Sequence, residues 1–204
     1  MVRCCNGVLR EFPVGWGIVA QVKGTLFVDY VRMLRAKKGV DWARYLAPQD
    51  LVYLEERISP DGWYPMTTFE RMGVAILDEV AGKNLGMAEL WGRMSTDGLC
   101  ALHPNLLAPG DPCESLMRFQ VLRQGFFDYP ALTMREITDG EASVEVAYGM
   151  GARAEEAAAH QTLGFFARLL EVSGATHVKV GFAACSWDGA PRTIITMQWA
   201  SPHS

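Results

Sequence analysis

The alternation of apolar and polar residues is clearest in the last third of the chain, where strand and helix periods follow one another. Residues 142–148 carry an apolar side chain at every second position, which predicts a half-buried strand. The Asp139-Gly140 pair before it is typical of a hairpin turn. We therefore expect this strand to pair with residues 132–137.

A long helix and a second pair of strands are predicted to follow. Residues 152–172 show the helical period, and residues 178–182 and 193–199 alternate again on either side of a glycine turn. Residues 130–200 are therefore predicted to form an antiparallel sheet with one crossing helix, in the order β-β-α-β-β.

The amino-terminal part has helical spacing instead. Thr67 and Glu70 stand in capping-box spacing, so a helix is expected to begin at Thr67 and to end near Gly82. Asp111 followed by Pro112 is a second start signal. Further helices are predicted over residues 26–37, 49–57, 87–102 and 111–124.

These elements predict the α+β class, with a helical amino-terminal part packed on a carboxyl-terminal antiparallel sheet. Residues 17–204 are expected to be one domain, with the mainly helical part over 17–129 and the sheet over 130–200. Residues 1–16 fit no element and are predicted to be a leader that need not be ordered.

Composition and charge exclude several classes of protein. The formal net charge is −4 and the basic residues are dispersed, so nucleic acid is not an expected partner. No apolar run reaches the length that spans a bilayer, and no secretory signal is recognisable. The five cysteines lack CxxC spacing, which argues against zinc and against a disulfide framework. A cytoplasmic protein is expected.

His160, in the middle of the long helix, is the first candidate for a metal or haem ligand. On a helical wheel it falls on the polar arc with Arg153, Glu156 and Arg168, opposite the apolar residues. The wheel therefore predicts a solvated histidine rather than a ligand.

Residues 149–154 resemble the GxGxxA dinucleotide fingerprint, because they follow a strand and open a helix. The fingerprint needs a parallel βαβ unit and an acidic residue about 20 positions later. Here the strand is predicted to pair in a hairpin, and the first acid after the next strand is Asp188. A glycine-rich turn is the better interpretation unless strands 142–148 and 176–182 are parallel neighbours.

No catalytic motif is present, so an enzyme is not expected. The sequence lacks the GxSxG, HExxH and P-loop patterns. Glu55 and Glu56 are adjacent, and adjacent residues on a helix point about 100° apart, so they do not readily share a substrate.

Three segments resemble an uncharacterised family of roughly 200-residue proteins, largely from myxobacteria. They are ERISPDGWYP at 56–65, WGR at 91–93 and QTLGFFARLLEVSGA at 161–175. The resemblance would cover residues 18–200, and it implies no known chemistry.

The carboxyl-terminal pattern is also similar, more distantly, to a superfamily of ligand-binding domains. These are the vinyl-reductase-like domains, the haem nitric-oxide-binding domains and a vesicle-tethering subunit. The resemblance implies a hydrophobic pocket between the helices and the sheet. The haem domains carry a Tyr-x-Ser-x-Arg signature, but here Tyr148 is followed by Met150 and Ala152. The vinyl-reductase type tends to have a second cysteine in the last strand, and residues 193–199 contain none. No cofactor and no metal are therefore expected, and haem is the alternative.

The resulting hypothesis is a non-catalytic small-molecule-binding or sensory module with an apolar pocket, which is expected to self-associate as a homodimer. Arg93 is expected to fix a polar end of the ligand. The predicted ligand-binding residues are Trp63, Tyr64, Phe69, Trp91, Arg93, Phe126, Phe127, Phe165 and Phe166. The alternative is a protein–protein adaptor with Trp63, Tyr64 and Trp187 as exposed anchors. A haem-based gas sensor is the third hypothesis.

Overall fold

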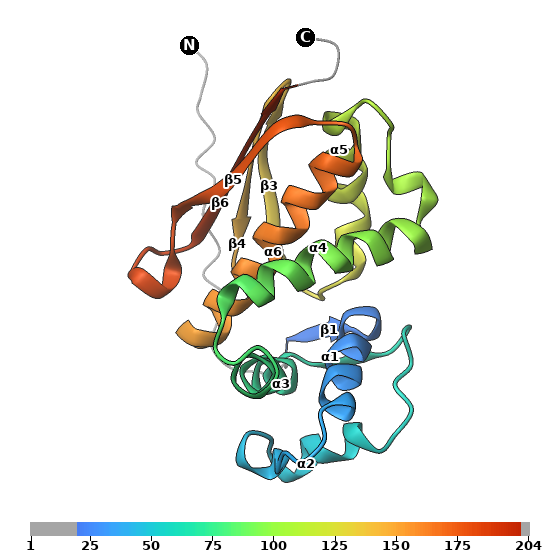
Figure 1. The fold of residues 1–204 in the computed structure, drawn as a ribbon, viewed down its shortest axis with the longest axis vertical. Helices are drawn as coiled ribbons and strands as arrows, with labels where there is room; N and C mark the ends of the chain where they lie inside the picture. The colour runs from blue at the N-terminus through green and yellow to red at the C-terminus, as the bar shows by residue number, and fades with distance from the viewer. Residues whose placement is uncertain (1–19, 201–204) are drawn as a thin grey trace, which may run out of the picture.

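The computed structural model describes residues 20–200, and it has a helical part and a part built on a sheet (Figure 1). The helices are α1 Gly24–Ala36, α2 Pro48–Leu51, α3 Met66–Glu79, α4 Leu85–Leu102, α5 Pro112–Leu122 and α6 Ala152–Val172. The strands are β1 Gln21–Lys23, β2 Trp63–Pro65, β3 Leu132–Thr138, β4 Glu141–Val146, β5 Thr176–Ala184 and β6 Thr193–Ala200. The predicted α+β class is confirmed. The predicted leader, 1–16, lies outside the described residues.

The sheet has the strand order β3-β4-β6-β5, and every neighbouring pair is antiparallel. The predicted β-β-α-β-β platform is thus confirmed. Strand β4 lies between β3 and β6, so it is not a neighbour of β5. A parallel βαβ unit is therefore absent around residues 149–154, and the dinucleotide interpretation is excluded.

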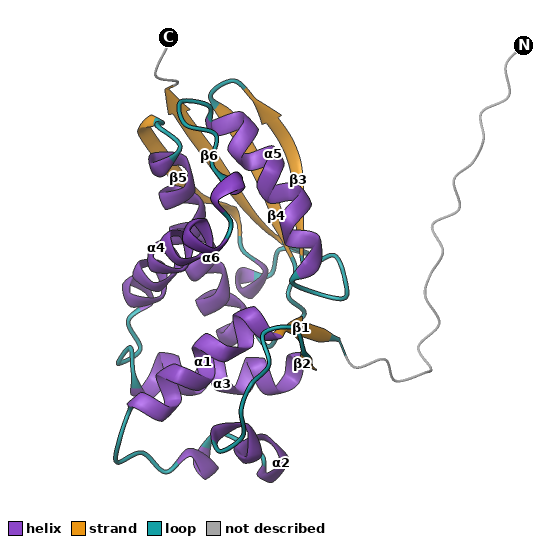
Figure 2. Ribbon diagram, turned by 90° about the vertical axis from the view of Figure 1, so that its right-hand side faces the viewer, coloured by secondary structure: helices purple, strands orange, loops and turns teal. Residues whose placement is uncertain are grey.

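One face of the sheet forms the core with α5 and α6. The alternation predicted for β4 and β6 places Val144, Val146, Ile195 and Met197 on this inner face, all fully buried. Phe166 of α6 is also fully buried in the same core cluster. Figure 2 shows α5 and α6 beside the four-stranded sheet, with α1, α2 and α3 below it.

Helix α4 crosses α6 at very short range, because glycines occupy the crossing point on both helices. A Cβ atom on Gly92 would lie 1.8 Å from the carbonyl oxygen of Gln161, and one on Gly164 would lie 2.0 Å from that of Glu89. Only residues without a side chain allow the two backbones to approach this closely. Helix α6 is therefore enclosed between the sheet and α4.

This second covering layer corrects the prediction for His160. Its Nδ1 lies 2.7 Å from Oε1 of Glu89 on α4, and the side chain is only 20% exposed. The ring also meets Phe182 edge to face at 5.0 Å. The wheel identified the polar arc correctly, but it could not show that α4 would cover that arc. His160 is partly buried and not solvated.

One predicted helix cap and one predicted helix length in the amino-terminal part are also corrected. The capping box at Thr67 does not form, because α3 begins at Met66 with Pro65 in the N-cap position. The Glu70 carboxylate instead accepts a hydrogen bond from the backbone N–H of Gly151, at 2.8 Å. It thereby joins α3 to the turn before α6. The helix predicted over 49–57 is the short α2 followed by a 3₁₀ turn.

A buried ion pair stabilises the amino-terminal part. The Asp50 carboxylate is fully buried, and it accepts hydrogen bonds from Nε and Nη2 of Arg71 at 2.6 and 2.9 Å and from the Thr68 hydroxyl at 2.6 Å. Burial alone would raise the pKa of Asp50, but the Arg71 guanidinium and the Thr68 hydroxyl outweigh it and lower that pKa.

No helix within residues 20–200 combines the length and the apolar character that a membrane crossing requires.

Candidate functional site

A cavity of about 520 Å³ lies between the two parts of the molecule. Helix α1 forms one wall, α4 and α6 form the other, and α5, β3 and residues 126–127 close the inner end. The size is within the range of small-molecule sites in proteins. Its aromatic lining consists of Tyr30, Phe69, Trp91, Phe119, Phe126, Phe127, Tyr148, Phe165 and Phe166.

The α1 wall is a helical stripe. Leu26, Tyr30 and Met33 recur at four- and three-residue spacing and therefore share one face of the helix. The Tyr30 ring stacks on Phe69 with a centroid distance of 4.1 Å. Its hydroxyl donates to Oε1 of Gln161 on the opposite wall, at 2.9 Å, and burial raises the pKa of Tyr30.

Packed phenyl rings form the inner end of the cavity. Phe119 of α5 is 2% exposed, and its ring lies 4.8 Å from that of Phe165 and 5.3 Å from that of Phe166. The Phe126 ring lies 6.4 Å from Phe119 on the other side. This end is accordingly apolar, and its rings support one another.

Tyr148, at the end of β4, adds a polar group whose hydrogen bonds are already made. Its hydroxyl lies 2.5 Å from the hydroxyl of Thr162, and its backbone N–H donates to the Glu155 carboxylate at 2.9 Å. Burial raises the pKa of Tyr148, so the phenol stays neutral over the physiological range. The inner half of the cavity therefore presents neutral groups with partners inside the protein.

The remaining polar and apolar groups gather at the rim, which we define as the exposed lining residues. Arg32 and Asp29 form an ion pair at 3.1 Å on α1, with side chains 73% and 51% exposed. On the other wall, Met94 and Leu102 are 61% and 71% exposed. The rim consists of Asp29, Arg32, Met94, Gly98, Leu102 and His103.

Six of the predicted ligand-binding residues line this cavity, although they come from separate elements. They are Phe69, Trp91, Phe126, Phe127, Phe165 and Phe166.

The other three predicted residues lie elsewhere. Trp63 is 40% exposed on β2 beneath the Lys23 ammonium, and Tyr64 stacks on Phe27 at 4.4 Å. Arg93 donates to the Glu171 carboxylate on α6 at 2.5 Å, and neither residue lines the cavity. Because Trp91 lines the cavity and Arg93 follows it by two residues on a helix, the two side chains diverge. The predicted polar anchor is therefore not at the cavity.

The sequence analysis did not single out several residues that line the cavity. Tyr30 and Phe119 were missed because they stand in ordinary helical patterns, although the stripe on α1 was readable as a helical repeat; Gln161 stands in the segment 161–175, which gave no role for it. His103 follows the last residue of α4 and carries no recognisable motif, and the structure places it on the rim.

No group of histidine, cysteine and acidic side chains that could hold a metal ion occurs within residues 20–200. The three cysteines in that range are free, and burial raises the thiol pKa of Cys100, Cys113 and Cys185.

Comparisons with known proteins identify the fold. No protein-family model matches the chain, and no curated protein matches it in sequence. The resemblance to a myxobacterial family thus rests on the sequence segments alone.

Solved structures of H-NOX proteins do match. A mutant H-NOX protein from K. algicida in the unliganded Fe(II) state has a TM-score of 0.61 at 14% identity, over 88% of this chain and 97% of that chain. An H-NOX protein from S. oneidensis in the Fe(II)NO state has a TM-score of 0.58 at 10% identity, over 88% and 99%. A mutant H-NOX from T. tengcongensis has a TM-score of 0.56 at 16% identity, over 88% and 98%. The chain has the H-NOX fold, as the more distant resemblance implied.

Proposed function

We propose that this protein is a non-catalytic small-molecule-binding or sensory module that holds an apolar ligand between its two parts. The observation that carries the proposal is the cavity of about 520 Å³ lined by aromatic side chains from α1, α3, α4, α5 and α6. The likeness to H-NOX proteins supports it, because structures in that group record haem and nitric oxide as ligands.

The preference for an apolar ligand follows from the inner half of the cavity. Tyr30 is bonded to Gln161 and Tyr148 to Thr162, and no charged side chain lines this half. A charge placed there would lose its hydration without gaining a partner, which is strongly unfavourable. An apolar group would displace water from aromatic surface and gain about 25 cal/mol for each Å² removed from water.

Haem is the ligand that the solved relatives suggest, and the residues present do not fit it. Haem iron is held in proteins by histidine, cysteine, methionine or tyrosine. The tyrosines that line this cavity are Tyr30 and Tyr148, whose raised pKa opposes the phenolate that iron would need. Met33 and Met94 also line it, but methionine holds haem iron together with a histidine. Of the three described histidines only His103 lines the cavity, and it is exposed on the rim.

The signature residues that accompany the propionate groups of haem are also missing. Met150 and Ala152 occupy the positions after Tyr148 that are Ser and Arg in the haem signature, and neither side chain donates a hydrogen bond. Arg32 is the one guanidinium among the described lining residues, and it lies on the exposed rim of α1 rather than next to Tyr148, where the haem signature has its arginine. We therefore favour a ligand other than haem.

A matched pair of substitutions on α4 tests the proposed function. Leu99 lines the cavity and is partly buried, whereas Leu90 on the same helix is 46% exposed and does not line it. The neutral fluorescent probe N-phenyl-1-naphthylamine is titrated into wild type, Leu99→Trp and Leu90→Trp. Filling the cavity is expected to weaken binding about tenfold or more in Leu99→Trp, with Leu90→Trp near wild type. Equal binding by all three, or none by wild type, would refute the proposal.

Haem sensing is the second candidate function, favoured by the solved relatives. It is tested by adding hemin to the purified protein and to His103→Ala. An intense Soret band that shifts on adding nitric oxide and is lost in His103→Ala would establish haem and replace our proposal. Spectra that match free hemin in both proteins would support our proposal of an apolar ligand other than haem.

A further inference from the structure

The polar groups on the rim of the cavity indicate which charge the ligand carries and how it is oriented. We propose that the cavity takes an apolar monocarboxylic acid, whose hydrocarbon body lies among the aromatic rings and whose carboxylate is held at the rim by Arg32. This inference rests on the proposed function and adds the charge and the orientation of the ligand.

The position of the charge follows from where the cavity has a cation. The inner half has none, and its hydroxyl groups are bonded within the protein. Arg32 lines the same cavity at its solvent side. A molecule with one charged end can therefore bury its body and keep the charge in water beside Arg32, in the same way that amphipathic side chains do at protein surfaces.

Arg32 has donors to spare for a carboxylate. Only its Nη1 is engaged, by one oxygen of Asp29 at 3.1 Å, and the planar guanidinium has further N–H groups in a fork that matches a carboxylate. An exposed pair three residues apart on a helix contributes little to stability. A ligand carboxylate can thus join or displace Asp29 at small cost.

The rest of the rim favours an acid over an amine. His103 and Ser95 line the α4 side of the cavity, and each can donate a hydrogen bond to an oxygen. Asp29 is the one carboxylate among the described lining residues, and Arg32 already occupies it. Met94 and Leu102, which precede Ser95 and His103 in the chain, are exposed apolar side chains. The ligand's carbon atoms next to its carboxylate would cover them.

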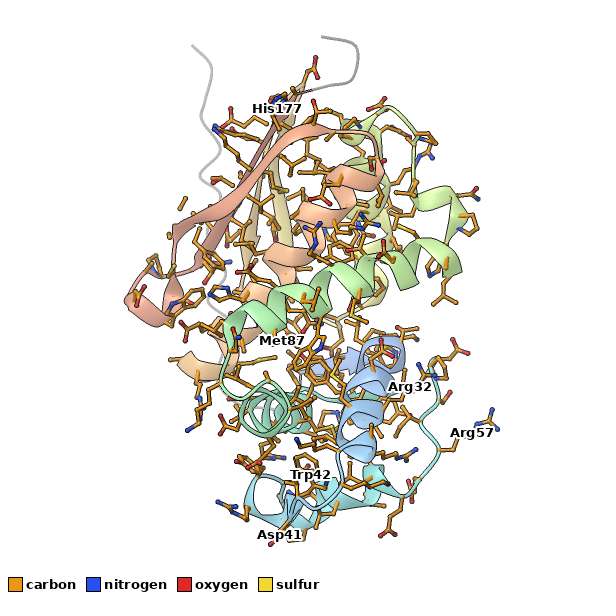
Figure 3. The ribbon with its side chains drawn as sticks, in the orientation of Figure 1. Arg32, Asp41, Trp42, Arg57, Met87 and His177 are labelled. Carbon is orange, nitrogen blue, oxygen red and sulfur yellow. The ribbon has the colours of Figure 1, made fainter. Side chains whose placement is uncertain are left out.

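The test compares three ligands with the same chain and different head groups: palmitate, methyl palmitate and hexadecylamine. Each displaces N-phenyl-1-naphthylamine from wild type, Arg32→Gln and Arg57→Gln, below the concentration at which the ligand forms micelles. Arg57 is the matched control, because it is an exposed arginine of the same half that points away from the cavity (Figure 3). Thermal unfolding verifies that both variants fold.

Wild type and Arg57→Gln are expected to bind palmitate about tenfold more tightly than methyl palmitate, and Arg32→Gln is expected to lose this preference. The preference should also shrink as salt is added, because the rim is exposed. Equal binding of acid and ester by wild type, or an unchanged preference in Arg32→Gln, would overturn the inference while the proposed function stands. Tighter binding of hexadecylamine would overturn it in favour of Asp29 as the anchor. If the fluorescent probe itself does not bind, the proposed function fails as well.

Discussion

The crossing of α4 and α6 gives the sharpest prediction, because one helix carries both the perturbed site and its control. Gly92 packs against α6, where an added Cβ would lie 1.8 Å from the oxygen of Gln161 and 2.8 Å from the backbone nitrogen of Phe165. Gly98, on the same helix, has nothing within 4 Å of that position. Gly92→Ala and Gly98→Ala therefore introduce the same group into a closed and an open environment.

The magnitude follows from the overlap. Ordinary contact begins at 3.4 Å, so the crossing must widen by about 1.6 Å, and the obstructing atoms are backbone that cannot change rotamer. Overpacking costs about 1–3 kcal/mol, and an overlap with backbone belongs at the upper end. Replacing glycine by alanine within a helix returns about 1 kcal/mol in both variants. Gly92→Ala should therefore be about 2 kcal/mol less stable than wild type, and Gly98→Ala up to about 1 kcal/mol more stable.

Urea unfolding followed by circular dichroism measures both free energies, and the propensity contribution cancels in their difference of about 3 kcal/mol. A difference of this size separates the two melting temperatures by about 6–12 °C in a domain of this length. Gln161 and Phe165 line the cavity, so Gly92→Ala should also weaken probe binding. Equal stability of the two variants, within about 0.5 kcal/mol, would show that the helices do not cross as described.

Three further outcomes are expected. Asp50→Asn removes the buried negative charge that pairs with Arg71 and should cost about 3–5 kcal/mol in urea unfolding; wild-type stability would contradict the buried pair. Since the folded pKa of Asp50 is lowered, its contribution is complete above the ordinary carboxyl pKa near 4 and is lost as the pH falls further. The stability gap between wild type and Asp50→Asn should hence narrow below about pH 4, and a constant gap would argue against the linkage. Phe27→Ala opens a fully buried site and should cost about 3–5 kcal/mol, with Val52→Ala, 39% exposed, as the near-neutral control.

The sheet and its crossing helix were predictable because their signals are local. Alternation in β4 and β6, the Asp139-Gly140 turn and the cap at Asp111 each depend on residues within a few positions, and the structure contains all of them. The packing of α4 on α6 was not predictable in this way. It depends on Gly92 and Gly164, which are 72 positions apart and carry no pattern of their own.

The cavity was predictable in part, for a related reason. The chain has more aromatic residues than a small core needs, which indicates an apolar cavity between the helices and the sheet. Phe126 and Phe165 could therefore be named from their residue type and their position in the sequence. Which polar residue faces this cavity depends on how each helix is rotated about its own axis. Arg93 was the nearest guanidinium in sequence to a lining tryptophan, yet it pairs with Glu171. Arg32, on another helix, is the one that reaches the rim.

Strand β1 joins the helical half to the residues that follow α5. Lys23 donates its backbone N–H to the carbonyl of Phe126 at 2.8 Å, and Asp128 donates to that of Gln21 at 3.2 Å. Arg153 at the start of α6 pairs with Asp78 near the end of α3, which is a second link between the two halves. Among the described residues no hydrogen bond or ion pair joins Arg32 to the end of α4. The Tyr30–Gln161 hydrogen bond is a link across the cavity itself, so moving the α1–α3 half away from α6 would break this bond while leaving strands β3, β4, β5 and β6 paired.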